Sequence, residues 1–208
     1  MKRIWILGLT SLLACGGRSN GGPAPVPGFG MLGGQRVLVL PVHYAQPVAG
    51  GWVGGASAGE SLRRLNAEIA FALGERKGTT QWVLPEEIAA ALARQPAVDV
   101  HVYGLSADPV RRASLGRAER VKDPLYGEIR RLAALFDTRY AVFPVELWYE
   151  PARAGYGGEG RAALWTLLLD ARTGFVLWSG LVRGEPGAAT SERALVHVAE
   201  AFARQLVP

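Results

Sequence analysis

The chain has 208 residues, of which 49% are hydrophobic and 20% charged, and it carries a formal net charge of +5. This length suits one folded domain with a substantial core. One cysteine excludes an internal disulfide, and three scattered histidines without cysteine partners do not make a zinc site, so we expect no metal and no other cofactor. Arginine outnumbers lysine, which we do not interpret as nucleic-acid binding.

Residues 1–14 have the composition of a secretory signal. Lys2 and Arg3 give a positive start, Ile4 to Leu13 is an apolar run, and Ala14 is a small residue before Cys15. The run is too short to span a bilayer, which takes about 20 apolar residues. Cleavage after Ala14 would remove two cations and no acid, which lowers the formal charge from +5 to +3.

Leu12-Leu13-Ala14-Cys15 resembles the lipobox of bacterial lipoproteins. In that family the signal is cut before the cysteine, which then carries the lipids. The resemblance implies a covalent lipid on Cys15 and stable membrane attachment, and Gly16 after it implies the outer membrane. It also explains the lone cysteine, because a free exposed thiol is a liability in an oxidising compartment. The alternative is an ordinary signal peptide with an incidental cysteine.

The segment from Cys15 to residue 35 is rich in glycine, proline and small polar residues, and such a composition cannot bury a core. We expect residues 15–35 to be the lipidated cysteine and a tether, which spans roughly 25 Å as a flexible coil. Residues 36–208 then form a single domain that faces the periplasm, close to its membrane.

The first half of this domain predicts alternating strands and helices. An apolar run predicts a strand over 36–42, and a glycine-rich loop follows at 50–59. Apolar residues at helical spacing predict a helix over 59–75, a short strand follows at 80–84, and Pro85 opens a helix that runs to about Arg94. Alternation over 98–105 predicts a strand, and 106–122 is a polar excursion.

The second half predicts a helix opened by Asp123-Pro124, then strands over 139–149, 161–170 and 174–182, and a final helix over 190–206. Residues 170–174 predict a tight hairpin turn between the last two strands. Pro144 lies inside the first of these strands, which predicts an edge strand or a bulge. The element order predicts an α/β (α+β) fold: a mixed β-sheet with helices packed on it, a C-terminal antiparallel hairpin and a final helix.

One motif raises the alternative of a serine hydrolase. Residues 55–59, GASAG, fit the G-x-S-x-G nucleophile elbow with Ser57 as nucleophile, and Asp170 and His197 follow in the order of a catalytic triad. The context argues against this function. The residues before the motif form a loop rather than a buried strand, and Asp170 lies in the hairpin turn. We therefore expect Ser57 or a neighbour to cap the helix, and no catalytic residue.

Two surfaces are candidates for binding a partner. The basic segment 111–131 includes Arg111, Arg112 and Arg120, and could meet an acidic protein face or an anionic envelope polymer. The connection over 149–160 carries Tyr149 and Tyr156, and aromatic side chains on a glycine-rich loop can anchor a partner.

The C-terminal half contains a hairpin of the form D-x-x-[ST]-G-x-[VIL]-[VIL]-W-x-[GA], matched by Asp170, Thr173, Gly174, Trp178 and Gly180. It resembles the envelope lipoproteins related to the curli secretion lipoprotein, to activator lipoproteins of penicillin-binding proteins and to the N-terminal domain of TolB. The chain lacks room for the long hairpins of the curli pore, so we expect no channel. The resemblance implies a lipid-anchored periplasmic accessory protein that binds an envelope protein, in assembly or regulation of a peptidoglycan synthase or an export machine.

Overall fold

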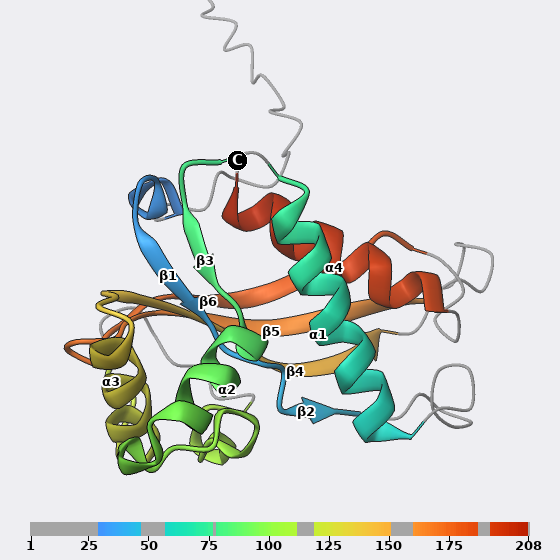
Figure 1. The fold of residues 1–208 in the computed structure, drawn as a ribbon. Coiled ribbons are helices and arrows are strands. Elements are labelled where there is room, and N and C mark those ends of the chain that lie inside the picture. The colour runs from blue at the N-terminus through green and yellow to red at the C-terminus, as the bar shows by residue number, and fades with distance from the viewer. Residues whose placement is uncertain are drawn as a thin grey trace, which may run out of the picture.

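The computed structural model describes residues 29–46, 57–76, 78–111, 119–150, 160–186 and 192–207. The predicted signal peptide, Cys15 and the glycine-rich stretch at 47–56 lie outside these residues. The described part has the predicted α/β fold, a mixed sheet with helices packed on it, and the structure shows that the helices cover both faces (Figure 1).

The sheet contains parallel and antiparallel parts, in the order β3-β1-β4-β5-β6. Its strands are β1 (Arg36–Val39), β2 (Tyr44–Ala45), β3 (Gln81–Val83), β4 (Tyr140–Glu150), β5 (Arg161–Asp170) and β6 (Val176–Arg183). β1 lies parallel to β3 on one side and to β4 on the other, and β2 continues beside the second half of β4. The antiparallel part, β4-β5-β6, contains the predicted C-terminal hairpin.

Helices cover both faces of this sheet. Their bounds are α1 (Ala58–Gly74), α2 (Pro85–Arg94), α3 (Leu125–Leu135) and α4 (Glu192–Leu206). α1 and α4 pack on one face with the 3-10 helix η1 (Phe29–Leu32). α2 and α3 pack on the other face, together with the 3-10 helices η3 (Pro96–Val98), η4 (Val102–Gly104) and η5 (Asp108–Val110).

The strands are apolar in continuous runs because both faces of the sheet are buried. In β1, Val37 and Val39 contact the α1/α4 cluster, whereas Leu38 points to the α2/α3 cluster, and all three are at most 1% exposed. Alternation along a strand therefore separates two hydrophobic cores, one on each side of the sheet.

Two predictions about local structure are wrong. Residues 98–105 form no strand, because Asp99 adopts a left-handed φ of 46° and the chain turns into η4, from which Val102 packs into the α2/α3 core. The predicted tether also extends too far. Phe29 and Leu32 are buried, and the Phe29 ring lies 5.1 Å from the Trp178 ring, centroid to centroid, so the folded part includes η1.

Pro144 lies in a central strand that carries a bulge. The β4-β5 register shifts between Pro144 and Glu146. On the other side of β4, pairing with β1 ends at Val142 and pairing with β2 begins at Glu146. A proline has no backbone N–H, so it is tolerated where a ladder is interrupted.

The hairpin motif has a physical basis at each matched position. Asp170 Oδ1 accepts hydrogen bonds from the backbone N–H groups of Arg172 and Thr173, both at 3.1 Å, and Gly174 has a φ of +76° that only glycine adopts readily. At Gly180, an added Cβ would lie 2.5 Å from an atom of the Trp178 ring. The predicted tight turn is confirmed, and Trp178 requires a glycine two residues later.

α4 approaches the sheet closely at Gly184. A Cβ there would lie 2.9 Å from the backbone nitrogen of Val198, an atom that cannot move without shifting the helix. We expect Gly184→Ala to lower the free energy of unfolding by about 1–3 kcal/mol, measured by urea denaturation. Gly74→Ala is the matched control, because a Cβ at Gly74 meets open space. Equal effects of the two substitutions would contradict this packing account.

Candidate functional site

The described residues form two neighbouring hollows that share Tyr103. The larger, called here the α1–α2 hollow, has a volume of about 710 Å³ and lies between these two helices and the ends of β1 and β3. The smaller, the α2–η4 hollow, has a volume of about 430 Å³. Volumes of this size are typical of sites for small ligands or for side chains of a partner.

The α1–α2 hollow lies where the topology of the sheet changes direction. The chain leaves β1 through α1 to reach β3 on one side, and leaves β3 through α2 and α3 to reach β4 on the other side of β1. Because α1 and α2 cover opposite faces, a crevice opens outside the carboxyl ends of β1 and β3. In open α/β sheets this position is where ligands bind.

α1 forms one wall of this hollow. Ser57 caps the helix, since its Oγ accepts a hydrogen bond from Glu60 N at 3.2 Å. Leu65, Ile69 and Leu73 face the core and leave Arg63 and Asn66 beside the hollow. Asn66 Oδ1 accepts a hydrogen bond from Val42 N at 2.9 Å, which joins α1 to the chain that leaves β1.

His43 forms part of the floor and is held in its neutral form. Its Nε2 accepts a hydrogen bond from Leu105 N at 3.1 Å, so the proton lies on Nδ1, which donates to the Pro41 carbonyl at 2.8 Å. The ring also packs edge-on against Phe143, with centroids 5.3 Å apart. Burial lowers the pKa of His43, and this effect outweighs the hydrogen bond to Pro41.

α2 forms the opposite wall. Pro85 occupies the first turn, and Glu86 and Glu87 follow it. Glu87 forms a salt bridge with Arg36 at 3.2 Å, whereas Glu86 forms none with a described residue. Tyr103 lies beside this wall with 56% of its surface exposed. Burial of the remainder, together with the charge of Glu86, raises the pKa of Tyr103.

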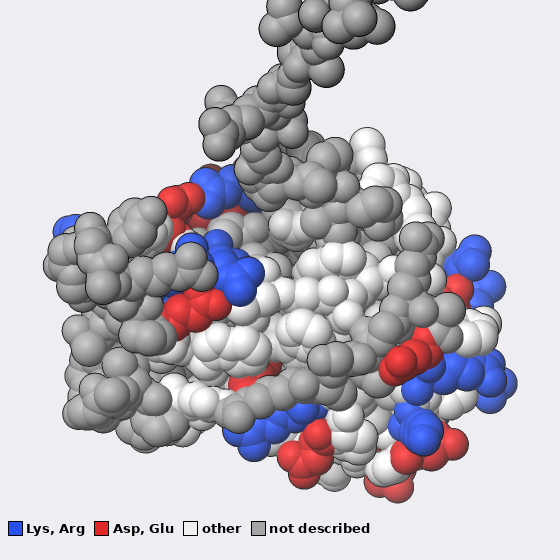
Figure 2. All heavy atoms as spheres, turned by 180° about the vertical axis from the view of Figure 1, so that it is seen from behind, with Lys and Arg blue, Asp and Glu red and all other residues white. Residues whose placement is uncertain are grey.

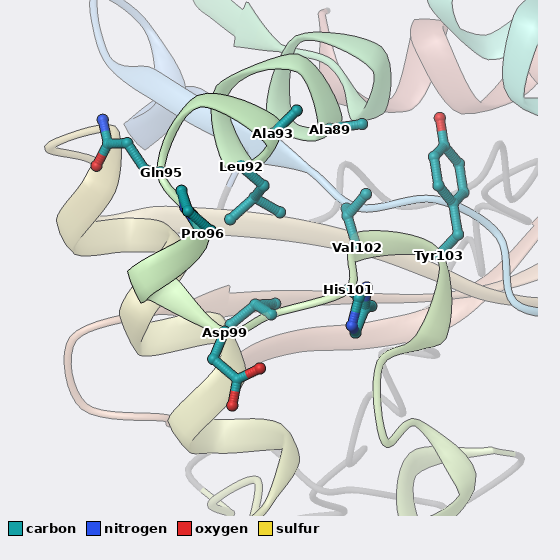
Figure 3. Close-up of a pocket in the computed structure, with 10 residues that line it drawn as sticks. Ala89, Leu92, Ala93, Gln95, Pro96, Asp99, His101, Val102 and Tyr103 are labelled. Atoms are coloured by element: carbon teal, nitrogen blue, oxygen red, sulfur yellow. The ribbon is translucent and has the colours of Figure 1, made fainter.

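Figure 3 shows the α2–η4 hollow on the other side of Tyr103. Ala89, Leu92 and Ala93 line it from α2, and Val102 faces them from η4. Tyr103 therefore stands between two apolar-walled hollows.

A separate polar cluster surrounds Glu146, which is 0% exposed. Arg111 Nη2 lies 2.8 Å from Glu146 Oε1, and Gln46 Nε2 donates to the same oxygen at 2.7 Å. The Arg111 guanidinium also lies over the Tyr44 ring, 4.5 Å from its centroid. Burial and a hydrogen bond with Asp108 raise the pKa of Tyr44 to about 12.

Two arginines of the candidate basic surface already have partners within the chain, although both are exposed. Arg111 neutralises Glu146, and Arg120 lies over the Phe175 ring at 4.7 Å, while Arg112 lies outside the described residues. On the face in Figure 2, positive and negative side chains lie next to one another in mixed groups. Binding of an anionic polymer through these arginines stays a prediction.

Tyr149 is the last residue but one of β4, and its ring packs on the α1/α4 core. Burial raises the pKa of its hydroxyl to about 12, and this hydroxyl has no hydrogen-bond partner among the described residues. Tyr156 lies outside the described residues. A binding role for either tyrosine stays a prediction.

The residues of the alternative catalytic triad are not brought together. Ser57 caps α1, and Asp170 serves the hairpin turn and a salt bridge to Arg139 at 2.9 Å. Burial alone would raise the pKa of Asp170, but hydrogen bonds from Arg139 and Thr173 outweigh it and lower that pKa. His197 Nδ1 is buried without a hydrogen-bond partner in the described part of the chain, whereas a triad requires that nitrogen to bind the aspartate. Residues 55 and 56 of GASAG lie outside the described residues, and the contacts of Ser57, Asp170 and His197 lend the serine-hydrolase alternative no support.

In the part of the chain that the structure describes, no group of three or more histidine, cysteine or acidic residues is placed to hold a metal ion. No described helix is long and apolar enough to cross a bilayer.

The chain is similar in fold to several proteins of solved structure. No family profile and no curated protein matches the chain. The LpoB C-terminal domain from Salmonella enterica is 18% identical, with a TM-score of 0.37 over 73% of this chain and 82% of that one. Lipoprotein GNA1162 from Neisseria meningitidis is 14% identical, with a TM-score of 0.40 over 83% of this chain and 97% of that one. A PelC dodecamer from Paraburkholderia phytofirmans is 13% identical, with a TM-score of 0.35 over 85% and 90%.

Sequence reasoning missed the residues that line the α1–α2 hollow, above all Arg63, Asn66 and Tyr103. A signal was present, since His43 and Pro85 directly follow two predicted strands. Their meeting depends on β1 and β3 being parallel neighbours, which no local pattern specifies.

Because His43 is neutral in the fold, we expect the free energy of unfolding to depend on pH through this residue. Because the folded-state pKa lies below 6.5, the unfolded chain takes up the proton first as pH falls. The contribution of neutral His43 to the free energy of unfolding is therefore present above pH 6.5 and is lost as the pH falls toward the folded-state pKa of His43. We expect His43→Gln, which keeps an acceptor for Leu105 N, to reduce the loss of unfolding free energy on acidification. Urea titrations across this range test it, with the exposed His101→Gln as control. An unchanged slope in His43→Gln would refute the assignment.

Proposed function

We propose that the chain is a lipid-anchored periplasmic accessory protein that acts by binding another envelope protein, without catalysis. Its role would be the assembly or regulation of a peptidoglycan synthase or an export machine. The observation that carries this proposal is the pair of apolar-walled hollows on either side of the exposed Tyr103. An exposed aromatic side chain beside apolar pockets is the usual anchor of a protein interface.

The sequence supports the envelope location. Leu12-Leu13-Ala14-Cys15 fits a lipobox, and the hairpin from Asp170 to Gly180 matches the pattern of envelope lipoproteins. In the folded domain, the first described residues form η1, which packs on Trp178 of the hairpin. The tether would therefore join the domain on the face that carries α4.

The anchor is tested by Cys15→Ser in a native host. Without the cysteine no lipid can be attached, so the protein should move from the membrane fraction to the soluble periplasmic fraction, and mass spectrometry should show no acyl chains. A Cys15→Ser protein that stays with the membrane and sediments like the wild type would contradict a lipid anchor on this residue.

The binding role is tested by photocrosslinking in intact cells. A benzophenone side chain placed at Tyr103 should capture one dominant envelope protein, identified by mass spectrometry as a cell-wall synthase or an export component. The control position is Phe71, which is 66% exposed on α1 and does not line either hollow. If Tyr103 captures nothing that Phe71 does not, the proposed function fails.

A further inference from the structure

We infer that the α1–α2 hollow binds a protein segment in which apolar side chains are flanked by one acidic and one basic side chain, the acid facing α1 and the base facing α2. This inference rests on the proposed function, because it names the chemistry of the partner segment at that site.

The interior of the α1–α2 hollow is apolar. Val42 and Pro85 are buried at its base, and the half-buried side chains of Leu62 and Leu84 lie at its sides. Water in contact with these walls would be displaced by an apolar side chain of the occupant, and burial of apolar area stabilises a complex by roughly 25 cal/mol per Å². The centre of the occupant is therefore apolar.

The α1 wall and the α2 wall of the hollow carry charges of opposite sign. Arg63 on α1 and Glu86 on α2 both line the hollow, and neither forms an ion pair with a described residue. Their neighbours differ in this respect, because Arg64 is paired with Glu60 and Glu192, and Glu87 is paired with Arg36. One positive and one negative group are thus left available on opposite walls.

This pairing of charges selects the occupant. A polyanion would meet Glu86 and Glu87, and a polycation would meet Arg63, so a ligand of one sign is repelled at one wall. A segment with an acid at one end and a base at the other satisfies both walls at once. Asn66 adds a donor, since its Oδ1 is engaged by Val42 N and its amide N–H groups donate to no described residue.

The two hollows together set the length of the occupant. Tyr103 lines both the α1–α2 hollow and the α2–η4 hollow, so an occupant that covers its exposed ring reaches from one to the other. An extended protein segment places successive side chains about 3.3 Å apart along its length, so neighbouring side chains of one segment can enter both hollows and cover Tyr103. The occupant is therefore a stretch of a protein.

The test uses the full chain in detergent and fluorescein-labelled synthetic peptides, with binding measured by fluorescence anisotropy. The peptides share two central leucines and differ in the flanking pair: glutamate and lysine in either order, two glutamates, two lysines, or two glutamines. Exposed ion pairs contribute about 0.2–1 kcal/mol each, so a mixed-charge peptide should bind about three- to tenfold more tightly than the single-sign peptides.

Charge reversal on each wall should change the preferred peptide. Arg63→Glu leaves two acidic walls, so the two-lysine peptide should become the tightest. Glu86→Arg places an unpaired cation on each wall, while Glu87 stays paired with Arg36, so the two-glutamate peptide should become the tightest. Arg130→Glu on α3 lowers the net charge by the same amount as Arg63→Glu, but outside the hollow, and should leave the preference for mixed charge unchanged. Circular dichroism and thermal denaturation confirm that each variant is folded.

Two results would overturn the inference. One is an absence of peptide binding, or binding that is indifferent to the flanking charges. The other is that Arg63→Glu and Glu86→Arg shift the preference no more than Arg130→Glu does. Crosslinking separates this failure from that of the proposed function. If Tyr103 still captures an envelope protein while the charge reversals have no effect, the binding role stands and the assigned chemistry fails. If Tyr103 captures nothing, the proposed function itself fails.

Discussion

The carboxylate of Glu146 constrains the centre of the molecule. It is fully buried in β4, and a buried charge is tolerated only with paired charges and hydrogen bonds around it. Arg111 supplies the countercharge and Gln46 a second donor, so the chain after β2 and the segment at η5 must both stay on β4. Removing Arg111 would take a countercharge away from a fully buried carboxylate, which is costlier than replacing both partners with apolar groups.

The chain that leaves β1 and runs through β2 to Gln46 connects the Glu146 cluster with the floor of the α1–α2 hollow. Gln46 N donates to the Leu147 carbonyl and His43 N to the Val145 carbonyl, so this connection lies along β4 for its whole length. Asn66 and Leu105 then bind to it from α1 and from the chain after η4. The floor of the hollow is therefore held by hydrogen bonds from three directions, which favours a preformed site over one that orders on binding.

The three residues of the alternative catalytic triad lie in different surroundings. Ser57, Asp170 and His197 each have a separate local environment: a helix cap, a turn and a buried helix face. The polar groups left available lie instead on the walls of the hollow, where Arg63 and Glu86 have no ion-pair partners among the described residues. Arg111 shows why a basic sequence segment is a poor guide to a binding surface, because its guanidinium is paired with the buried Glu146 of the same chain.

The sequence by itself determined the helices, the long strands and the hairpin turn. Helical spacing and proline position specified α1 and α2, and the local hydrogen bonds of Asp170 with the positive φ of Gly174 specified the turn. These features depend on residues a few positions apart, so their patterns are visible in the chain. The tertiary structure alone decided the sheet order, the pairing of Arg111 with Glu146 and the meeting of Arg63, Glu86 and Tyr103 around one hollow. Those contacts join distant segments, and they exist because β1 lies between β3 and β4 with helices on opposite faces.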